Sequence, residues 1–441
     1  MQVKVAKFGG SSLADAEQFK KVAAIVQADP QRAYVVPSAP GKRSYKDVKV
    51  TDMLYGIHKK AEDCQDYSND LQQVFLRFQE IIRDLGMDYD MEPEIRKIEG
   101  KLREGTSADY VASRGEYLSG LVLAKYLDYD FLDPSEGIFF QEDGSFDQIR
   151  TDQVLGRLLQ SHKKAVIPGF FGSMPDGRIK TFSRGGSDVT GAIVARAANA
   201  ALYENWTDVS GFLMCDPRIV HNPRVIRLLT YRELRELSYM GATVLHEHSI
   251  FPVQEAGIPI NVRNTNAPGE PGTMIVSRIP DDVVSDPITG IAGRKCFNVI
   301  TLEKAMMNAT LGYGRRLLSI LERYCIPFEH MPSGIDTLCL VVDSSYMNRD
   351  NKEALLRDIR KECQPDTLHV TEDIALIATV GHGMQNRVGM AARIFTALSL
   401  SNINIRMIDQ GSSELNIIIG VHNDDFEEAL RSIYHSFIPR S

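Results

Sequence analysis

The final third of the chain repeats itself at a constant offset, and this duplication limits the folds that the chain can adopt. Gly312 and Leu321 recur at one and the same spacing as Gly389 and Leu398. The apolar positions around them repeat at the same offset. Each copy therefore has the pattern strand, glycine turn, amphipathic helix, strand, glycine turn, strand. We expect two copies of a small βαβ-type module, at about residues 295–370 and 371–441.

The first part of the chain alternates between strand-like and helix-like segments. The segments VKVAKF, AYVVPSA, KAVIPGFFG and ALYENW have the pattern of strands, and helical patterns occur at 13–27, within 51–127 and at 187–201. Strands separated by helices predict a mainly parallel sheet in an α/β domain. Around 264–286 the sequence becomes rich in Pro, Gly, Asp and Thr without a sustained period. A boundary there gives domains at 1–285 and 286–441.

Charge and hydropathy disfavour several classes of protein. Lys and Arg total 50 against 58 for Asp and Glu, and the formal net charge of −8 argues against nucleic acid and against a basic membrane-binding surface. No window reaches 18 uninterrupted apolar residues, and the first residues lack the layout of a secretory signal. The six cysteines include no CxxC pair, which is typical of reduced thiols. We expect a cytoplasmic protein that acts on small molecules.

A glycine-rich segment follows the first predicted strand. Residues 7–12 (KFGGSS) join an apolar strand to a helical pattern. Glycines there allow backbone N–H groups to approach a ligand closely, and Lys7 at the strand end adds a full positive charge. The segment predicts an anion site, here called the amino-terminal cradle. The alternative is that Ser11 or Ser12 is a plain helix N-cap.

A second glycine-rich segment, residues 182–188 (FSRGGSD), also joins a loop to a helical pattern. Arg184 beside exposed amides suits bidentate capture of a carboxylate or phosphate, and Asp188 can hold an ammonium group or a metal-bound water. We call this segment the mid-chain cradle. Two cradles suggest two anionic reactants, and the turn at 168–172 is expected to border the same cleft.

Residues 114–116 (RGE) lie inside a helical pattern, where a glycine costs about 1 kcal/mol relative to alanine. Glu116 is therefore a candidate to face a ligand cation. The alternative is a solvated Arg and Glu pair on a helix surface.

Two standard nucleotide motifs are absent. Gly41-Lys42 is followed by Arg43 and has Val36 where the motif GxxxxGK[ST] needs its first glycine. The GxG pairs beginning at Gly312 and Gly381 do not continue to the third glycine of GxGxxG, which disfavours a nicotinamide dehydrogenase. No protein metal site is expected either, because residues 246–248 (HEH) lack a third ligand at suitable spacing.

These motifs together resemble the aspartate kinases of the amino acid kinase family. KFGGSS, RGE, SRGGSD, Thr207-Asp208 and the later Asp216-Pro217-Arg218 occur in that order, and the duplicated tail looks like tandem ACT domains. The resemblance covers essentially the whole chain. It implies a mainly parallel sheet sandwiched by helices, followed by two α+β modules with the order βαββαβ. The chain departs from the usual pattern at Leu213, where a tyrosine is common, and at Thr243, where a lysine is common.

The resemblance also implies roles for particular residues. Lys7 and the amides of the amino-terminal cradle would hold the ATP phosphates, and Asp188 would lie close to both reactants. Glu116 would bind the ammonium group of aspartate and Arg184 its α-carboxylate. The other implied aspartate contacts are Ser38 and Thr51, and the implied ATP contacts are Lys7, Gly9, Gly10, Ser11, Thr207, Asp208, Asp216 and Arg218.

The implied reaction is transfer of phosphate from ATP to L-aspartate, giving ADP and β-aspartyl phosphate. A carboxylate with a pKa near ~3.9 reaches the site already ionised, so no general base and no catalytic histidine are expected. Catalysis would depend on positioning and on neutralising phosphate charge through Lys7, the glycine amides, Arg218 and Mg²⁺.

The ACT-like modules imply control by an amino acid, lysine or threonine or both, and assembly of a homodimer or larger homo-oligomer. The expected effector positions are Gly312, Phe328, Ser333, Asp336, Asn404, Ile405, Gln410 and Ser413. The alternative for these residues is a packing role in hairpins and caps. Two further functions stay open. One is a related kinase acting on glutamate, acetylglutamate or a nucleoside monophosphate, and the other is an amino-acid sensor with an inactive kinase domain.

Overall fold

The structure is a computed structural model that describes residues 2–183, 185–242, 245, 247–280 and 286–439, with the side chains of 247–249 and 349–350 left out of the description. The chain forms two compact units. The first contains residues 1–212, 225–231 and 244–280, and the second contains 213–224, 232–243 and 281–441. Two short segments that precede the change in composition near 264–286 therefore belong to the second unit. The boundary at 285 itself stays a prediction.

The first unit is built on an eight-stranded sheet with the order β3-β4-β2-β1-β7-β9-β10-β8. The six strands β3, β4, β2, β1, β7 and β9, which follow one another in this order, run parallel, and β10 pairs antiparallel with β9. This confirms the predicted mainly parallel α/β sheet. The strands of the sheet are β1 (Lys4–Phe8), β2 (Arg32–Pro37), β3 (Asp130–Phe131), β4 (Ala165–Val166), β7 (Leu202–Thr207), β8 (Leu228–Thr230), β9 (Ile260–Asn264) and β10 (Thr273–Val276).

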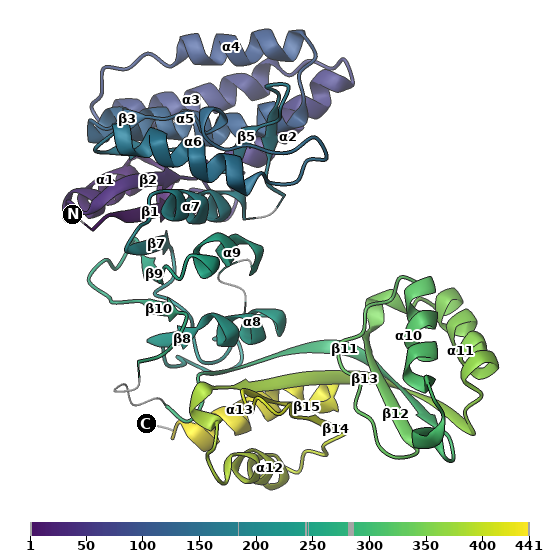
Figure 1. The fold of residues 1–441 in the computed structure, drawn as a ribbon. Coiled ribbons are helices and arrows are strands. Elements are labelled where there is room, and N and C mark those ends of the chain that lie inside the picture. Colours follow the sequence, from purple (N-terminus) through teal and green to yellow (C-terminus); the bar gives the residue numbers. More distant parts are fainter. Residues whose placement is uncertain (1, 184, 243–244, 246, 281–285, 440–441) are drawn as a thin grey trace. The chain divides into compact units, whose positions relative to one another are not determined.

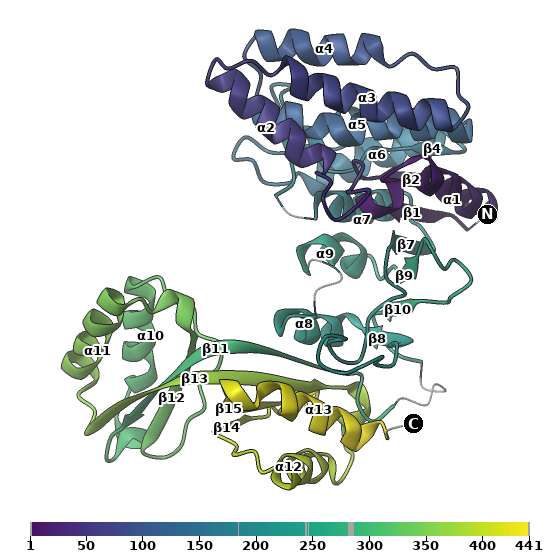
Figure 2. The same cartoon turned by 180° about the vertical axis from the view of Figure 1, so that it is seen from behind.

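Helices cover both faces of this sheet. One face packs against α1 (Ala16–Gln27) and α5 (Ala108–Leu127). An outer layer of α2 (Val50–Glu62), α3 (Ser68–Asp84) and α4 (Glu92–Arg103) packs on these two helices (Figures 1 and 2). The other face packs against α7 (Gly186–Ala197), which also contacts α6 (Gln148–Ser161) and α9 (Glu247–Glu255). A small hairpin, β5 (Phe171–Ser173) with β6 (Ile179–Thr181), leads into the mid-chain cradle.

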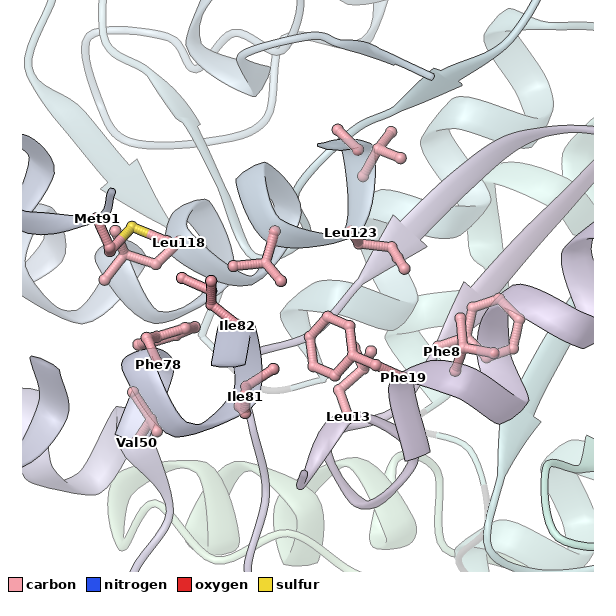
Figure 3. Packing of buried hydrophobic residues seen from close by; sticks show 14 of the residues in the cluster. Phe8, Leu13, Phe19, Val50, Phe78, Ile81, Ile82, Met91, Leu118 and Leu123 are labelled. Atoms are coloured by element: carbon pink, nitrogen blue, oxygen red, sulfur yellow. The ribbon is translucent and has the colours of Figure 1, made fainter. Parts of the chain in front are cut away.

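The main apolar core lies between the sheet and α1 to α5. Phe8 and Phe19 pack there with Phe78 of α3 and Leu118 of α5, and all four are fully buried (Figure 3). Apolar residues at the helical period supply this face, as the sequence predicts for amphipathic helices. No helix in the part of the chain that the structure describes has both the length and the apolar character needed to cross a bilayer.

The first helical pattern is interrupted in the structure. A 3-10 helix, η1 (Gly10–Leu13), follows the amino-terminal cradle, and α1 begins only at Ala16, where the Asp15 side chain accepts a hydrogen bond from Gln18 N at 3.0 Å. The continuous helix expected from residue 13 is therefore wrong, because Asp15 is the better N-cap. Neither Ser11 nor Ser12 caps a helix here, and Ser12 Oγ instead lies 2.8 Å from Thr265 Oγ1.

In the second unit the repeat keeps its spacing element by element. The strands β11 (Gly290–Glu303) and β13 (Thr367–Val380) are separated by the offset of the repeat, and so are the helices α10 (Tyr313–Arg323) and α12 (Met390–Leu400). Gly312 and Gly389 precede these helices with φ of 70° and 90°, a backbone conformation that glycine adopts without strain. The remaining elements are β12 (Thr337–Asp343), α11 (Arg349–Cys363), β14 (Met407–Asp409), β15 (Asn416–His422) and α13 (Phe426–Phe437). The helix α8 (Tyr231–Tyr239) also belongs to this unit after its first residue.

The two modules share one five-stranded sheet with the order β12-β11-β13-β15-β14. The long strands β11 and β13 run side by side through both modules, with α10 and α11 at one end and α12 and α13 at the other (Figure 1). Residues 297–303 of β11 pair with β12, whereas 290–294 pair with residues 376–380 of β13. The first module is therefore inserted between two strands of the second. This pairing confirms the predicted α+β modules and adds a connection that the repeat alone did not predict.

Candidate active site

The site is built at the carboxyl edge of the parallel strands. Phe8 and Trp206, in neighbouring strands, pair in register, so the segments after β1 and β7 begin side by side. Gly9 N donates to the Trp206 carbonyl at 2.9 Å, and Ser38 N donates to the Phe8 carbonyl at 3.0 Å. Residues 9, 38 and 207, at the ends of three different strands, therefore meet at one edge, where ligands of open α/β sheets usually bind.

Lys7 and Asp188 join the two cradles. Lys7 is almost wholly buried, and its Nζ lies 2.5 Å from Asp188 Oδ1 in the first turn of α7. Asn205 of β7, the register partner of Lys7, donates from Nδ2 to the same carboxylate oxygen at 2.7 Å. The two glycine-rich segments, which lie far apart in the sequence, thus form one site with a buried cation at its centre.

The amino-terminal cradle is tightly packed at its glycines. A Cβ placed on Gly10 would lie 2.9 Å from the Ala39 carbonyl oxygen, and Gly41 N donates to the Gly10 carbonyl at 2.8 Å. Gly10 and Ser11 open η1, so their amides have no acceptor within that helix. The Gly9 amide is already bonded to Trp206, and Gly9 therefore does not offer this donor to a ligand.

Glu116 lies wholly buried on α5, next to the segment that follows β2. Its Oε2 has no hydrogen-bond partner among the described residues. Burial raises the pKa of this carboxyl to about 8, although a hydrogen bond from the Ala39 backbone lowers it in part. A Cβ on Gly115 would lie 2.8 Å from Ala39 Cβ, so α5 approaches this segment only because residue 115 is a glycine. Ala39 thus separates Glu116 from Gly10 of the cradle.

Thr51 lies in the first turn of α2, directly after Val50, whose side chain also packs at Gly115. It is half-buried. Ser38 and Thr51 therefore lie at the two ends of the segment that packs against the Glu116 region. The solvated Arg and Glu pair is excluded for this helix, because both side chains are buried and Arg114 lies over the rings of Tyr117 and Phe171.

The turn at 168–172 packs on the mid-chain cradle. A Cβ on Gly169 would lie 2.6 Å from both Cβ and Oγ of Ser187. Phe170 has φ of 85°, a left-handed conformation that is uncommon for a bulky residue, and its amide donates to Thr190 Oγ1 at 2.9 Å. Strain of this kind persists where surrounding contacts impose it, and it is frequent at functional sites.

The remaining predicted nucleotide contacts are divided between the two units. Thr207 and Asp208 lie at the end of β7, and Thr207 Oγ1 lies 3.2 Å from Asp208 Oδ1. Asp216 and Arg218 belong to the second unit, where Arg218 Nη2 donates to Asp216 Oδ2 at 2.6 Å. Arg184, Thr243 and His246 lie outside the described residues.

The predicted effector positions lie on the surface of the second unit. Six of the eight positions form three equivalent pairs of the repeat: Phe328 with Ile405, Ser333 with Gln410, and Asp336 with Ser413. Most of these positions are exposed, and the rest are half-buried. Asp336 Oδ1 accepts from Met307 N at 3.3 Å, and the Ser413 carbonyl accepts from Gln385 Nε2 at 2.7 Å. A capping role is thus visible for Asp336, whose carboxylate binds the first amide of a short 3-10 turn.

The chain is similar to known proteins along its whole length. Residues 2–264 match the model of the amino acid kinase family, and residues 377–437 match an ACT domain. Aspartokinase 3 of Bacillus subtilis is 37% identical over 99% of this chain and 98% of its own length. The chain belongs to the aspartokinases. This confirms the resemblance found in the sequence.

Solved aspartokinase structures agree with the fold. The crystal structure of Clostridium acetobutylicum aspartate kinase matches with a TM-score of 0.90 and 50% identity over 99% of both chains. Escherichia coli aspartokinase III, solved in complex with aspartate and ADP, matches with a TM-score of 0.74 over the full length at 24% identity, which supports the fold alone. As a member of this family the chain is a kinase.

The sequence analysis did not identify Asn205, and it did not predict the conformation of Phe170. Asn205 orients Asp188, and its signal was a polar residue in the middle of a buried strand, in register with Lys7. Phe170 was included only as part of a turn, because a positive φ at a non-glycine residue leaves no trace in the sequence.

Proposed function

We propose that this aspartokinase transfers the γ-phosphate of ATP to the β-carboxylate of L-aspartate, giving ADP and 4-phospho-L-aspartate. One observation carries the proposal: the ion pair of Lys7 and Asp188 unites the two anion cradles in a single site. A second buried region, around Glu116, adjoins that site across Ala39, and its Oε2, which accepts no hydrogen bond from the described residues, is suited to an ammonium group. The names of the relatives point to the same substrate.

The chemistry requires little proton transfer. The β-carboxylate is ionised at neutral pH, and its oxygen forms a bond to the γ-phosphorus while the bond from that phosphorus to the β–γ bridging oxygen breaks. Lys7 and the amides of Gly10 and Ser11 stabilise the charge that develops on the phosphate oxygens. Asp188 holds Lys7 in place before the nucleotide binds, and Asn205 fixes Asp188.

The substrate aspartate is bound by groups that contact both of its ends. Glu116 accepts the ammonium group, Arg184 binds the α-carboxylate, and Ser38 and Thr51 supply further polar contacts. The motifs assign Thr207 and Asp208 to the nucleoside, and they assign Asp216 and Arg218 to the ribose and phosphates. These assignments rest on the match of motifs and, for the residues of the first unit other than Arg184, on the positions described above.

Mg²⁺ fits as an ion carried by the ATP phosphates. The described residues contain no cluster of three acidic, histidine or cysteine side chains, so they form no protein cage for a metal. Mg²⁺ commonly takes one or two carboxylates together with substrate phosphates, and Asp188 is the carboxylate beside Lys7. When bound, the ion would neutralise phosphate charge.

Regulation and assembly belong to the second unit. We propose that an end-product amino acid, lysine or threonine or both, binds the effector positions and inhibits this first step of lysine, threonine and methionine synthesis. Exposed apolar side chains favour a homodimer or larger assembly through the modules: Phe328, itself an effector position, and Ile335 and Ile408, which are close to such positions in the sequence. Escherichia coli aspartokinase III has been solved with lysine and aspartate in a T-state.

A substrate screen tests the reaction. ADP release is measured with aspartate, glutamate, acetylglutamate and nucleoside monophosphates, and hydroxylamine is added to trap the acyl phosphate as a hydroxamate. We expect turnover only with aspartate as the acceptor, with ADP and hydroxamate formed in equal amounts. Turnover of another acceptor would assign the chain to a different kinase reaction, and no turnover would favour the inactive sensor.

Lys7→Ala tests the central charge. We expect kcat to fall about 100- to 1000-fold, the usual effect of losing one preorganised donor to a developing anion. The KM for aspartate should change less than about threefold. Steady-state kinetics measure both, and equal losses in kcat and in aspartate affinity would contradict the role assigned to Lys7.

A further inference from the structure

A buried arginine on α3 has no role in the site described so far. Arg77 is 4% exposed, and every other buried residue of α3 is apolar. A guanidinium placed among Val74, Phe78 and Ile81 loses its hydration, so its charge must be matched by fixed acceptors. The hydrogen-bond acceptors of Arg77 therefore show which segments of the chain its side chain holds in position.

Those acceptors come from the two segments that follow β1 and β2. Arg77 Nη1 donates to Asp47 Oδ2 at 2.9 Å and to the Val48 carbonyl at 3.1 Å. Its Nη2 donates to the Ala14 carbonyl at 3.2 Å and to the Gly41 carbonyl. One planar group thus ties three backbone carbonyls and one carboxylate to α3.

Two of these carbonyls, those of Ala14 and Gly41, belong to residues that adjoin the amino-terminal cradle. Ala14 directly follows η1, the 3-10 helix that begins with Gly10 and Ser11. Gly41 lies against the same residues: its amide donates to the Gly10 carbonyl at 2.8 Å, and a Cβ on Gly41 would lie 2.8 Å from Ser11 N. Arg77 therefore fixes both η1 and the residue that supports its first turn.

Asp47 and Val48 lie at the other end of the segment 41–48, here called the loop, which connects β2 to α2. Asp47 also accepts from Arg43 Nε at 3.0 Å. Arg77 binds the carbonyls of Gly41 and Val48, so it holds both ends of the stretch from 41 to 48. A cavity of about 440 Å³ lies beside this cluster, lined among others by Arg77, Asp47 and Leu76. This space leaves one side of the loop without packing. Besides the exposed Arg43–Glu80 ion pair at 3.1 Å, the buried guanidinium of Arg77 connects the loop to α3.

We propose that Arg77 is a positioning residue for nucleotide binding, which holds Gly41 and η1 so that the amides of Gly10 and Ser11 face the phosphates. The inference rests on the proposed site for ATP. Lysine cannot replace the guanidinium, because a point charge on a flexible stem does not span four acceptors in a plane.

The test compares Arg77→Lys and Arg77→Ala with Val74→Ala, a control that shortens a fully buried side chain one turn earlier on the same helix. ADP binding is followed by the fluorescence of Trp206, the single tryptophan, which stacks on Phe8 and whose carbonyl accepts from the Gly9 amide. We expect the Kd for ADP and the KM for ATP to rise about tenfold or more in both Arg77 variants, as for the loss of a charge-assisted hydrogen bond. The KM for aspartate should change less than about threefold.

Three further measurements make the result specific. Ethylguanidinium added to Arg77→Ala should restore part of the ADP affinity. Asp47→Asn, which keeps the backbone acceptors, should raise the KM for ATP by a smaller factor and serves as the second variant if Arg77→Ala does not fold. Val74→Ala should lower the Tm without changing either KM.

Unchanged ADP affinity in Arg77→Lys, or equal rises in both KM values as a general loss of structure would cause, overturns the inference. Lys7→Ala separates this failure from that of the proposed function. If the parent protein binds ADP and Lys7→Ala weakens catalysis while Arg77→Lys has no effect, only the role of Arg77 is lost. If the parent protein binds no ADP, the nucleotide site itself is wrong.

Discussion

The carboxyl of Glu116 is ionised only at unusually high pH in the free protein. Burial raises its pKa to about 8, well above the ordinary value of 4.5, because backbone hydrogen bonds and the charge of Arg114 offset only part of the lost hydration. An ammonium group placed against Oε2 would favour the ionised form. Binding of aspartate to Glu116 should therefore release a proton at pH values below about 8.

This coupling predicts how aspartate binding depends on pH. The KM for aspartate should fall as pH rises from 6.5 and level off above about 8, while the KM for ATP stays nearly constant. Glu116→Gln should weaken aspartate binding and remove the dependence. Steady-state kinetics between pH 6.5 and 9 provide the check, and a parent profile that is flat over this range would exclude Glu116 as the ammonium ligand.

The residues that sequence reasoning identified are those whose chemistry is visible in the local pattern. Lys7 at a strand end and Asp188 after two glycines were predicted in this way, and the structure places them in contact. Asn205 and Arg77 were missed, because each is defined by partners from other elements. A polar residue in a buried strand or on the apolar face of a helix is the signal that remains in such cases.

At the scale of elements, the sequence indicates the apolar periodicity of helices and strands more reliably than the residues at which these elements begin and end. The strands β11 and β13 and the helices α10 and α12 are separated by the same offset as the apolar positions of the repeat, because those positions form the buried faces of these elements. The start of α1 was misplaced, since the apolar period runs through η1 and hides the cap at Asp15. Short polar caps decide where a helix begins, and they carry a weaker pattern than its buried face.

Two glycines of the first unit, one in the turn between β4 and β5 and one inside α2, should respond in opposite ways to substitution by alanine. Gly169→Ala places a Cβ 2.6 Å from Ser187 and should push the turn at 168–172 away from the start of α7, with a fall in kcat and in thermal stability. Gly56→Ala in α2 meets nothing within 4 Å and should stabilise the chain by up to about 1 kcal/mol with unchanged kcat. Thermal unfolding and steady-state kinetics of the pair measure both effects. A neutral Gly169→Ala would show that the turn can move without loss.

At the scale of the whole molecule, the repeat showed two modules but not how they join. Similarity between copies says which segments fold alike, whereas strand pairing depends on contacts between residues that are distant in the chain. Residues 290–294 pair with 376–380, so the second module takes one of its strands from before the first module. The modules are therefore not separable by a cut between them, as a simple tandem order would allow.

This connection predicts which fragments of the second unit fold. Residues 371–441 lack the strand segment 290–294 and would expose the backbone of β13 from Leu376 to Val380 as a long apolar edge. We expect this fragment to aggregate or to show no cooperative melting, whereas residues 286–441 should unfold cooperatively.

A chimera that joins 286–294 to 376–441 through an Asn-Gly turn restores the antiparallel pair, because Arg294 and Leu376 lie opposite each other in the register. It should regain a cooperative transition by circular dichroism. Cooperative folding of 371–441 alone would show that the shared strand is dispensable, and the two modules would then be independent units that merely lie side by side.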